Sequence, residues 1–160
     1  MAISVGDKIP DVTLRTMTAD GPAAVQSGDV LGSGRVVLFA VPGAFTPTCS
    51  DHHLPGFVLR ADELAEKGVD AIACVAVNDA FVMGAWGEAQ DTDGKVLMLS
   101  DGNGEFTAAV GLEMDGSGFG LGTRSQRYAA ILDDGVVTEL LVEPGPGLDA
   151  SSVESVLGKL

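Results

Sequence analysis

The chain has 160 residues, of which 46% are hydrophobic, and its formal net charge is −14 from 23 acidic and 9 basic residues. This length and composition suit a folded core rather than a disordered segment, so we expect residues 1–160 to form a single domain. Nucleic acids and anionic membranes bind clusters of Lys and Arg, so a chain this acidic, with four lysines, is expected to bind neither.

The amino-terminal part of the chain is expected to lead into a buried strand. Met1–Lys8 has no basic start and no apolar core, so it resembles neither a signal peptide nor a transit peptide. No apolar stretch approaches the ~20 residues of a membrane-spanning helix, and we expect a cytoplasmic protein. Ile9–Arg15 alternates like a short strand, and residues 16–34 form mostly loop with an edge hairpin. The β-branched and aromatic run Val36–Val41 then predicts a central strand.

The segment after this strand sets a cysteine at the start of a helix. Pro42-Gly43 ends the strand, and Pro47 favours a helix that begins near Pro47–Thr48. Cys49 then falls in the first helical turn. There the unpaired backbone N–H groups and the helix dipole favour a thiolate, which is the nucleophilic form of cysteine.

The remaining elements alternate between helices and strands. We first expect a helix from Thr48 to Lys67-Gly68 bent at Pro55-Gly56, a strand over Val69–Val77 and a helix capped by Asn78 or Asp79. A turn over Asp91–Gly94, a strand over Lys95–Ser100, a helix over Glu105–Val110 and an irregular loop over Asp115–Gly122 are expected next. The chain is then expected to end with a hairpin of Arg127–Leu132 and Val136–Val142, a linker over Pro144–Gly147, and a helix capped by Ser151 or Ser152 that runs to Leu157. This order predicts an α/β, thioredoxin-like fold with a mixed central sheet flanked by helices. The fold alone gives no function.

The spacing Pro-x-x-x-Thr-x-x-Cys of Pro42, Thr46 and Cys49 suits cleavage of an O–O bond by a thiolate. The Thr46 hydroxyl is expected to turn toward the sulfur and the attacked oxygen, while backbone N–H groups at the helix start donate to the second oxygen. Pro42 limits water at the sulfur without adding a donor. A guanidinium would complete the site, and Arg127 and Arg124 are the candidates.

The sequence PGAFTPTC at Pro42–Cys49 resembles the peroxidatic motif of peroxiredoxins. The longer stretch PGAFTPTCSDHHLPGF at Pro42–Phe57, with VNDAFV at 77–82 and Trp86-Gly87, resembles the type II or five-type subfamily, and the resemblance covers nearly the whole chain. The resemblance implies that Cys49 is the peroxidatic cysteine, and that Thr46, Pro42 and Arg127 are the motif threonine, the motif proline and the active-site arginine. It also implies reduction of hydrogen peroxide and alkyl hydroperoxides through a cysteine sulfenic acid, with no metal, haem or flavin.

The chain departs from this family pattern at the resolving cysteine. Atypical two-cysteine members carry that residue in a Gly-Leu-x-Cys context, but here Gly147-Leu148-Asp149 is followed by Ala150. The other cysteine, Cys74, lies in an apolar strand. The resemblance therefore favours a one-cysteine cycle in which glutathione with glutaredoxin, or thioredoxin, reduces the sulfenic acid. It also implies a homodimer.

Several other residues have a possible structural role beside a functional one. Cys74 is more often a core residue than a resolving thiol. His52 and His53 lack two further ligands for a metal site, so His53 is expected to pack near the helix start or to tune the thiol. Trp86 and Phe119 either line the peroxide pocket or a dimer face, or only pack. Arg124 could instead pair with an acidic neighbour.

Two other functions are open from the residues alone. One is a thioredoxin-type disulfide oxidoreductase. The chain lacks the Cys-x-x-Cys motif of such enzymes, because the residue three positions after Cys49 is His52, and this argues against that function. The other is a peroxide-sensing redox switch that uses Cys49 once instead of turning over.

Overall fold

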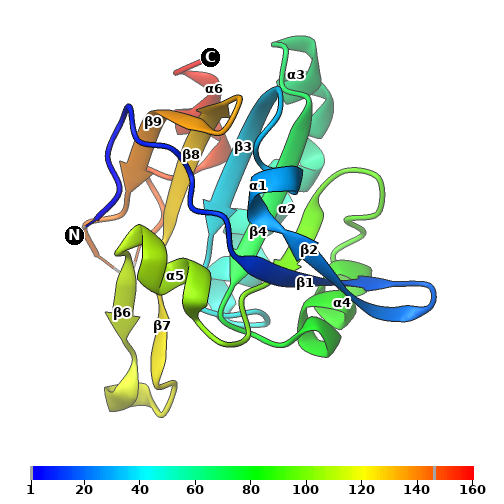
Figure 1. The fold of residues 1–160 in the computed structure, drawn as a ribbon, viewed down its shortest axis with the longest axis vertical. Coiled ribbons are helices and arrows are strands. Elements are labelled where there is room, and N and C mark those ends of the chain that lie inside the picture. Colours follow the sequence, from blue (N-terminus) through cyan, green and yellow to red (C-terminus); the bar gives the residue numbers. More distant parts are fainter. Residues whose placement is uncertain (1, 146) are drawn as a thin grey trace.

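A computed structural model describes residues 2–145 and 147–160. Seven strands form a central sheet in the order β2-β1-β5-β4-β3-β8-β9, and β6 and β7 form a separate antiparallel pair (Figure 1). The strands are β1 (Thr13–Thr18), β2 (Gly21–Gln26), β3 (Arg35–Ala40), β4 (Ala71–Ala76), β5 (Leu97–Ser100), β6 (Glu113–Asp115), β7 (Thr123–Ser125), β8 (Tyr128–Asp133) and β9 (Val136–Val142). The helices are α1 (Ser27–Val30), α2 (Leu54–Leu59), α3 (Ala61–Glu66), α4 (Ala80–Ala89), α5 (Glu105–Val110) and α6 (Val153–Leu157).

Strand β3 lies inside the sheet, as its apolar run predicts. It pairs in parallel with β4 on one side and antiparallel with β8 on the other, so the sheet is mixed. Successive side chains of a strand point to opposite faces. Val37 and Phe39 therefore enter one hydrophobic cluster, and Val36 and Leu38 enter the other.

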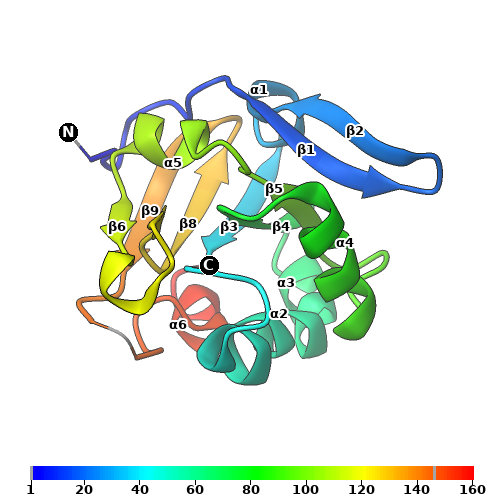
Figure 2. The same cartoon turned by 90° about the horizontal axis from the view of Figure 1, so that it is seen from below.

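Helices cover both faces of this sheet (Figure 2). Apolar residues of α2, α3, α4 and α6 pack in the cluster that contains Phe39, while those of α5 pack in the cluster that contains Leu38. The expected thioredoxin-like arrangement, a mixed sheet flanked by helices, is confirmed.

Most of the expected caps and turns occur where the local sequence encodes them. Asp79 caps α4, because its carboxylate accepts a hydrogen bond from the Val82 amide at 2.8 Å. Ser152 caps α6 in the same way through the Ser155 amide. The β8–β9 hairpin turns at Asp134-Gly135, where both φ angles are positive.

The expected bend at Pro55-Gly56 is wrong. The irregular part of the helix is instead a π-helical turn over Cys49–His53, directly before α2, with a second interruption at Arg60. Pro55 lies in the first turn of α2, where a missing N–H is tolerated. Because Pro55 has no N–H for the Asp51 carbonyl four residues earlier, the departure from α geometry falls on the preceding turn.

Three expectations differ from the structure in extent. The first strand begins at Thr13 rather than Ile9, since Pro10 has no N–H for a ladder. Residues 16–34 are more ordered than expected, because they hold the rest of the β1–β2 hairpin and α1. The 115–122 loop contains a short 3₁₀ turn at Ser117–Phe119. The described residues of the expected 144–147 linker form no helix or strand, and residue 146 lies outside the described residues.

Candidate functional site

The chain leaves β3 and turns sharply before it enters the cysteine helix. Phe45 takes a positive φ of 63° in this turn, and the Asn78 side-chain oxygen accepts a hydrogen bond from the Ala44 amide at 2.9 Å. Helical backbone begins at Pro47, as the sequence predicts. The turn thus places Cys49 at the start of the helix, close to the carboxyl end of β3.

The Cys49 sulfur lies against the guanidinium of Arg127. The Arg127 Nη2 atom donates a hydrogen bond to Cys49 Sγ at 3.0 Å, and the two side chains are buried. Arg127 directly precedes β8, whose Tyr128 pairs with Ala40 at the end of β3. The antiparallel pairing of β8 with β3 therefore delivers the arginine to the cysteine.

His53 makes the next contact in this buried cluster. Arg127 Nη1 lies 2.9 Å from His53 Nδ1. A guanidinium has no acceptor, so Nδ1 accepts and the imidazole proton is on Nε2, which donates to the Ser151 carbonyl at 2.9 Å. Burial, and then the positive charge of Arg127, lower the pKa of His53 from 6.5 to about 3. His53 is therefore a neutral imidazole that holds Arg127.

The other motif residues surround the sulfur less directly. Thr46 is half-buried, and its hydroxyl donates to the Gly43 carbonyl at 2.7 Å instead of turning toward the sulfur. The hydroxyl proton thus completes the turn, while its oxygen keeps lone pairs free to accept. Pro42 is half-buried, and its carbonyl accepts from Arg124 Nη1 at 3.2 Å. Arg124 therefore braces the turn and makes no hydrogen bond to Cys49, so of the two candidate arginines Arg127 is the one at the sulfur.

The remaining candidates are core or surface residues. Cys74 is fully buried on β4, and burial raises the pKa of its thiol well above the ordinary value. Trp86 is also fully buried, and its Nε1 donates to Ser50 Oγ at 2.9 Å. Phe119 is 88% exposed. His52 is exposed, and among the residues that the structure describes no group of three His, Cys, Asp or Glu could hold a metal ion.

Sequence reasoning missed two residues that contact this cluster. The Ser151 carbonyl binds His53, and the Glu143 carboxylate binds the segment that carries Ser151. His53 and Ser151 lie 98 positions apart, so no local motif joins them. The one signal available in the sequence was the position of Glu143, directly before the Pro/Gly-rich linker at Pro144–Gly147.

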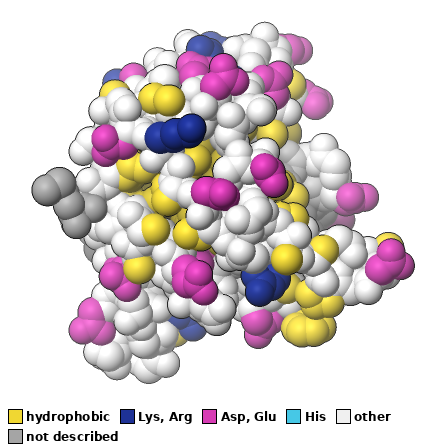
Figure 3. All heavy atoms as spheres, viewed as in Figure 1, with side chains coloured by type: hydrophobic (Ala, Val, Ile, Leu, Met, Phe, Trp, Pro, Cys, Tyr) yellow, Lys and Arg dark blue, Asp and Glu magenta, His cyan; other side chains and the backbone are white. Residues whose placement is uncertain are grey.

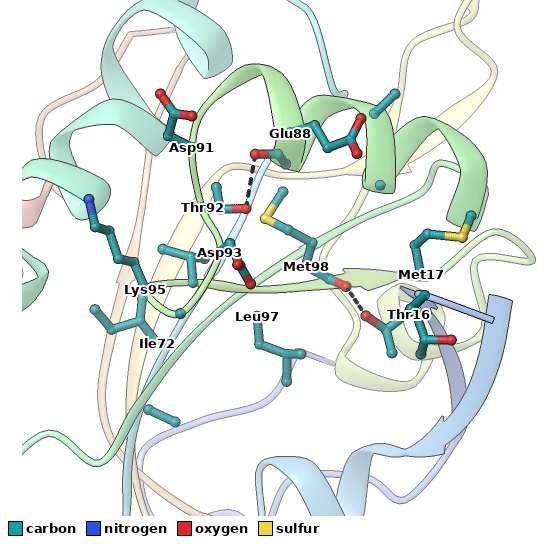
Figure 4. A pocket seen from close by; sticks show the side chains of 18 of the residues that line it. Thr16, Met17, Ile72, Glu88, Asp91, Thr92, Asp93, Lys95, Leu97 and Met98 are labelled. Atoms are coloured by element: carbon teal, nitrogen blue, oxygen red, sulfur yellow. Dashed lines mark hydrogen bonds between the residues drawn. The ribbon is translucent and has the colours of Figure 1, made fainter. Parts of the chain in front are cut away.

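One pocket of the described residues lies away from Cys49, Arg127 and His53. This pocket between β1, α4 and β5 is lined by residues such as Thr16, Glu88 and Met98, and the Cys49 cluster does not reach it (Figure 4). Carboxylates are spread over the face in Figure 3, with few basic side chains between them. Over the described ranges, none of the helices is long and apolar enough to span a membrane.

The comparisons with known proteins cover nearly the whole chain. The family model described as Redoxin matches residues 4–157. Peroxiredoxin-2E-2, chloroplastic, from Oryza sativa subsp. japonica is 57% identical over 99% of this chain and 72% of its own length. The chain belongs to the peroxiredoxin family. Peroxiredoxin-2B of Arabidopsis thaliana is 46% identical over 99% of this peroxiredoxin and 98% of its own length.

Solved structures agree with this membership. Reduced Prx3 from Vibrio vulnificus, crystallised in complex with H2O2, is 53% identical, covers 98% of each chain and superposes with a TM-score of 0.93. Peroxiredoxin 5 from Alvinella pompejana is 39% identical over 97% of this chain and 96% of its own, with a TM-score of 0.85. This peroxiredoxin is a thiol-dependent peroxidase, an oxidoreductase with a thioredoxin-like fold.

Proposed function

We propose that Cys49 is the peroxidatic cysteine and that Arg127 activates it. The observation that carries this proposal is the 3.0 Å hydrogen bond from Arg127 Nη2 to Cys49 Sγ, both buried. The guanidinium stays charged at all working pH values and has donors for both the sulfur and a bound peroxide oxygen. Thr46 and the amides at the helix start position the peroxide, and Pro42 keeps water from the sulfur.

The chemical step forms one bond and breaks one. The thiolate attacks the nearer peroxide oxygen, an S–O bond forms, and the O–O bond breaks. Cys49 is oxidised to a sulfenic acid, and the second oxygen leaves as an alkoxide or hydroxide that takes up a proton. Donors that are already oriented toward the leaving oxygen stabilise its developing charge without reorganisation. The proposed substrates are hydrogen peroxide and alkyl hydroperoxides, and the H2O2 complex of the Vibrio vulnificus Prx3 supports the first.

We propose that an external thiol reduces the sulfenic acid in a one-cysteine cycle. The position expected of a resolving cysteine holds Ala150, and the Cys74 thiol is buried with a raised pKa, so it is a poor nucleophile. A groove beside Thr48, between the 49–53 turn and residues 147–155, offers the reductant an approach. Glutathione with glutaredoxin, or thioredoxin, is the proposed reductant. Coupled assays with each system decide between them.

The proposal also covers the oligomeric state, the cellular location and the number of domains. The homodimer that the family resemblance implies is part of the proposal, and exposed side chains such as Phe45, Phe81 and Phe119 leave apolar surface available for it. Light scattering at micromolar concentration tests this. The two free thiols support a reducing cytoplasmic location, which cell fractionation tests, although two similar proteins are named chloroplastic. A single domain over residues 1–160 predicts one cooperative unfolding transition.

The deciding experiment compares two cysteine variants. Cys49→Ser should abolish peroxide consumption, because an alcohol does not ionise near neutral pH. Cys74→Ser is the matched control, and it should keep cycling with an external thiol. Turnover by Cys49→Ser would refute the site, and loss of cycling in a folded Cys74→Ser variant would refute the one-cysteine cycle. A single reaction without turnover, under every reductant, would favour the redox-switch alternative.

A further inference from the structure

Glu143 is a buried carboxylate that fastens a loop beside the active site. It follows β9 and is 8% exposed. Its Oε2 accepts hydrogen bonds from the amides of Asp149 and Ser151 at 2.9 and 2.7 Å and from Ser151 Oγ at 2.6 Å. Its Oε1 accepts from the Ala150 amide at 3.2 Å. Burial would raise the pKa of Glu143, but these hydrogen bonds lower it below its ordinary value, so the carboxylate stays ionised.

Hydrogen bonds link Ser151, His53 and Arg127 in series, and Glu143 contacts both ends of this series, one end through its backbone and the other through its side chain. Its amide donates to the Arg127 carbonyl at 3.0 Å, which fixes the backbone of the arginine. Its carboxylate fixes residues 149–151, from which the Ser151 carbonyl reaches His53. His53 then holds one Arg127 nitrogen at 2.9 Å, while the other donates to Cys49 Sγ.

The Ser151 carbonyl and the Arg127 guanidinium together place the His53 proton on Nε2. A neutral imidazole has one donor and one acceptor nitrogen, and either tautomer is possible. A carbonyl at Nε2 accepts a hydrogen bond and so selects the Nε2–H tautomer. Nδ1 is then free to accept from Arg127. If the carbonyl moves away, the Nδ1–H tautomer becomes accessible and turns a donor toward the guanidinium.

The Glu143 carboxylate is one of two anchors of the segment that carries the Ser151 carbonyl. The other is the Asp149 carbonyl, which accepts hydrogen bonds from Ser152 Oγ at 2.9 Å and Ser155 Oγ at 2.6 Å. The 149–151 segment follows the glycines Gly145 and Gly147 and belongs to no helix or strand. Its three amides all donate to Glu143. Removal of the carboxylate would leave these donors without this partner, and because Ser151 is fully buried, the segment would move to solvate them.

We propose that Glu143 is a positioning residue for the peroxidase reaction, which sets the orientation of Arg127 at Cys49 through Ser151 and His53. This inference rests on the proposed roles of Cys49 and Arg127. Catalysis by positioned groups is sensitive to small displacements, and a shift of about 1 Å can cost on the order of 100-fold in rate.

The test measures oxidation of the pre-reduced protein by H2O2 in a stopped-flow instrument. Glu143→Ala should lower the second-order rate constant by about 10- to 100-fold. Glu143→Gln should restore most of it, because an amide oxygen in the place of Oε2 keeps three of the four hydrogen bonds. Glu139→Ala is the matched control, because it removes a half-buried glutamate of β9 for which the structure gives no side-chain hydrogen bond. It should react like wild type.

A double-mutant cycle and a spectroscopic readout separate positioning from simple loss of stability. In a His53→Ala background, Glu143→Ala should change the rate constant by less than about twofold, because contacts in one network are not additive. Two-bond ¹H–¹⁵N spectra should show the Nε2–H tautomer of His53 in wild type and Glu143→Gln, and a mixture in Glu143→Ala. A purely structural glutamate would leave the tautomer unchanged.

The outcomes distinguish this inference from the proposed site. A wild-type rate for folded Glu143→Ala, an additive loss in the His53→Ala background, or an unchanged tautomer would overturn the positioning role while Cys49→Ser stays inactive. If Glu143→Ala does not fold, an unimpaired rate in Glu143→Asp, whose shorter side chain cannot reach all of these donors, overturns it instead. Turnover by Cys49→Ser would remove the proposed site itself.

Discussion

Replacement of Arg127 by glutamine is the most direct perturbation of the reacting sulfur. The wild-type guanidinium donates to Cys49 Sγ at 3.0 Å and to His53 Nδ1 at 2.9 Å, and it is 7% exposed. Glutamine is shorter, uncharged and has one amide donor group, so it cannot make both contacts. The variant therefore removes the positive charge at the sulfur and leaves the imidazole without its partner.

The size of the effect follows from the single contact with the sulfur. A hydrogen bond to a charged group contributes about 1.5–3 kcal/mol. Since about 1.4 kcal/mol corresponds to a factor of ten in rate, the rate constant for oxidation by H2O2 should fall by about 10- to 150-fold. The loss belongs to the oxidation step, because the guanidinium acts on the thiolate and the peroxide.

Trp86 provides the assay. It is the one tryptophan of the chain, and its indole nitrogen donates to Ser50, the neighbour of Cys49. Its emission in a stopped-flow instrument should therefore follow oxidation of the pre-reduced protein. Arg124→Gln is the matched control, because that guanidinium binds backbone carbonyls of the turn and makes no hydrogen bond to the sulfur. A folded Arg127→Gln variant that reacts within about twofold of wild type, or an equal loss in Arg124→Gln, would contradict the reasoning.

Three further predictions concern the surroundings of the sulfur. Burial and the adjacent guanidinium lower the pKa of His53 from 6.5 to about 3, so the unfolded chain binds more protons than the folded protein between these values. The free energy of unfolding should thus be highest above pH 6.5 and fall toward pH 3, by up to about 1.4 kcal/mol per pH unit from this group. Urea unfolding at pH 7 and pH 5 should show that the unfolding free energy of His53→Gln depends less on pH than that of wild type. An equal pH dependence in both proteins would be inconsistent with a buried neutral imidazole. Thr46→Val keeps the side-chain shape but loses the hydrogen bond to Gly43, so it should lower stability by about 1 kcal/mol and slow oxidation by H2O2; unchanged kinetics would exclude the hydroxyl from the reaction. Asp79→Ala removes the cap of α4 and should cost about 1 kcal/mol in the same unfolding assay, with no effect expected on the oxidation rate.

Local rules place Cys49 correctly, and they fail where the site depends on pairing between distant segments. An apolar run, a Pro-Gly break and a proline at the helix start suffice to predict a cysteine in a first turn. The choice between Arg124 and Arg127 needs the register of β8 against β3, in which Tyr128 faces Ala40. Periodicity alone does not encode that register. Ser151 and Glu143 were missed for the same reason, because their contacts join segments that no local pattern relates.

The burial of Cys49 separates the two halves of the proposed cycle. Its side chain has no exposed surface, so neighbouring residues cover the sulfur in the folded site. A thiol reductant must bring its own sulfur to about 2 Å from that of Cys49 to form a disulfide. We therefore expect the 49–53 turn to open between oxidation and reduction, which would break the contacts of Arg127 with both Cys49 and His53. The π-helical turn lacks the regular hydrogen bonding of an α-helix, so it is the segment of this helix best suited to open.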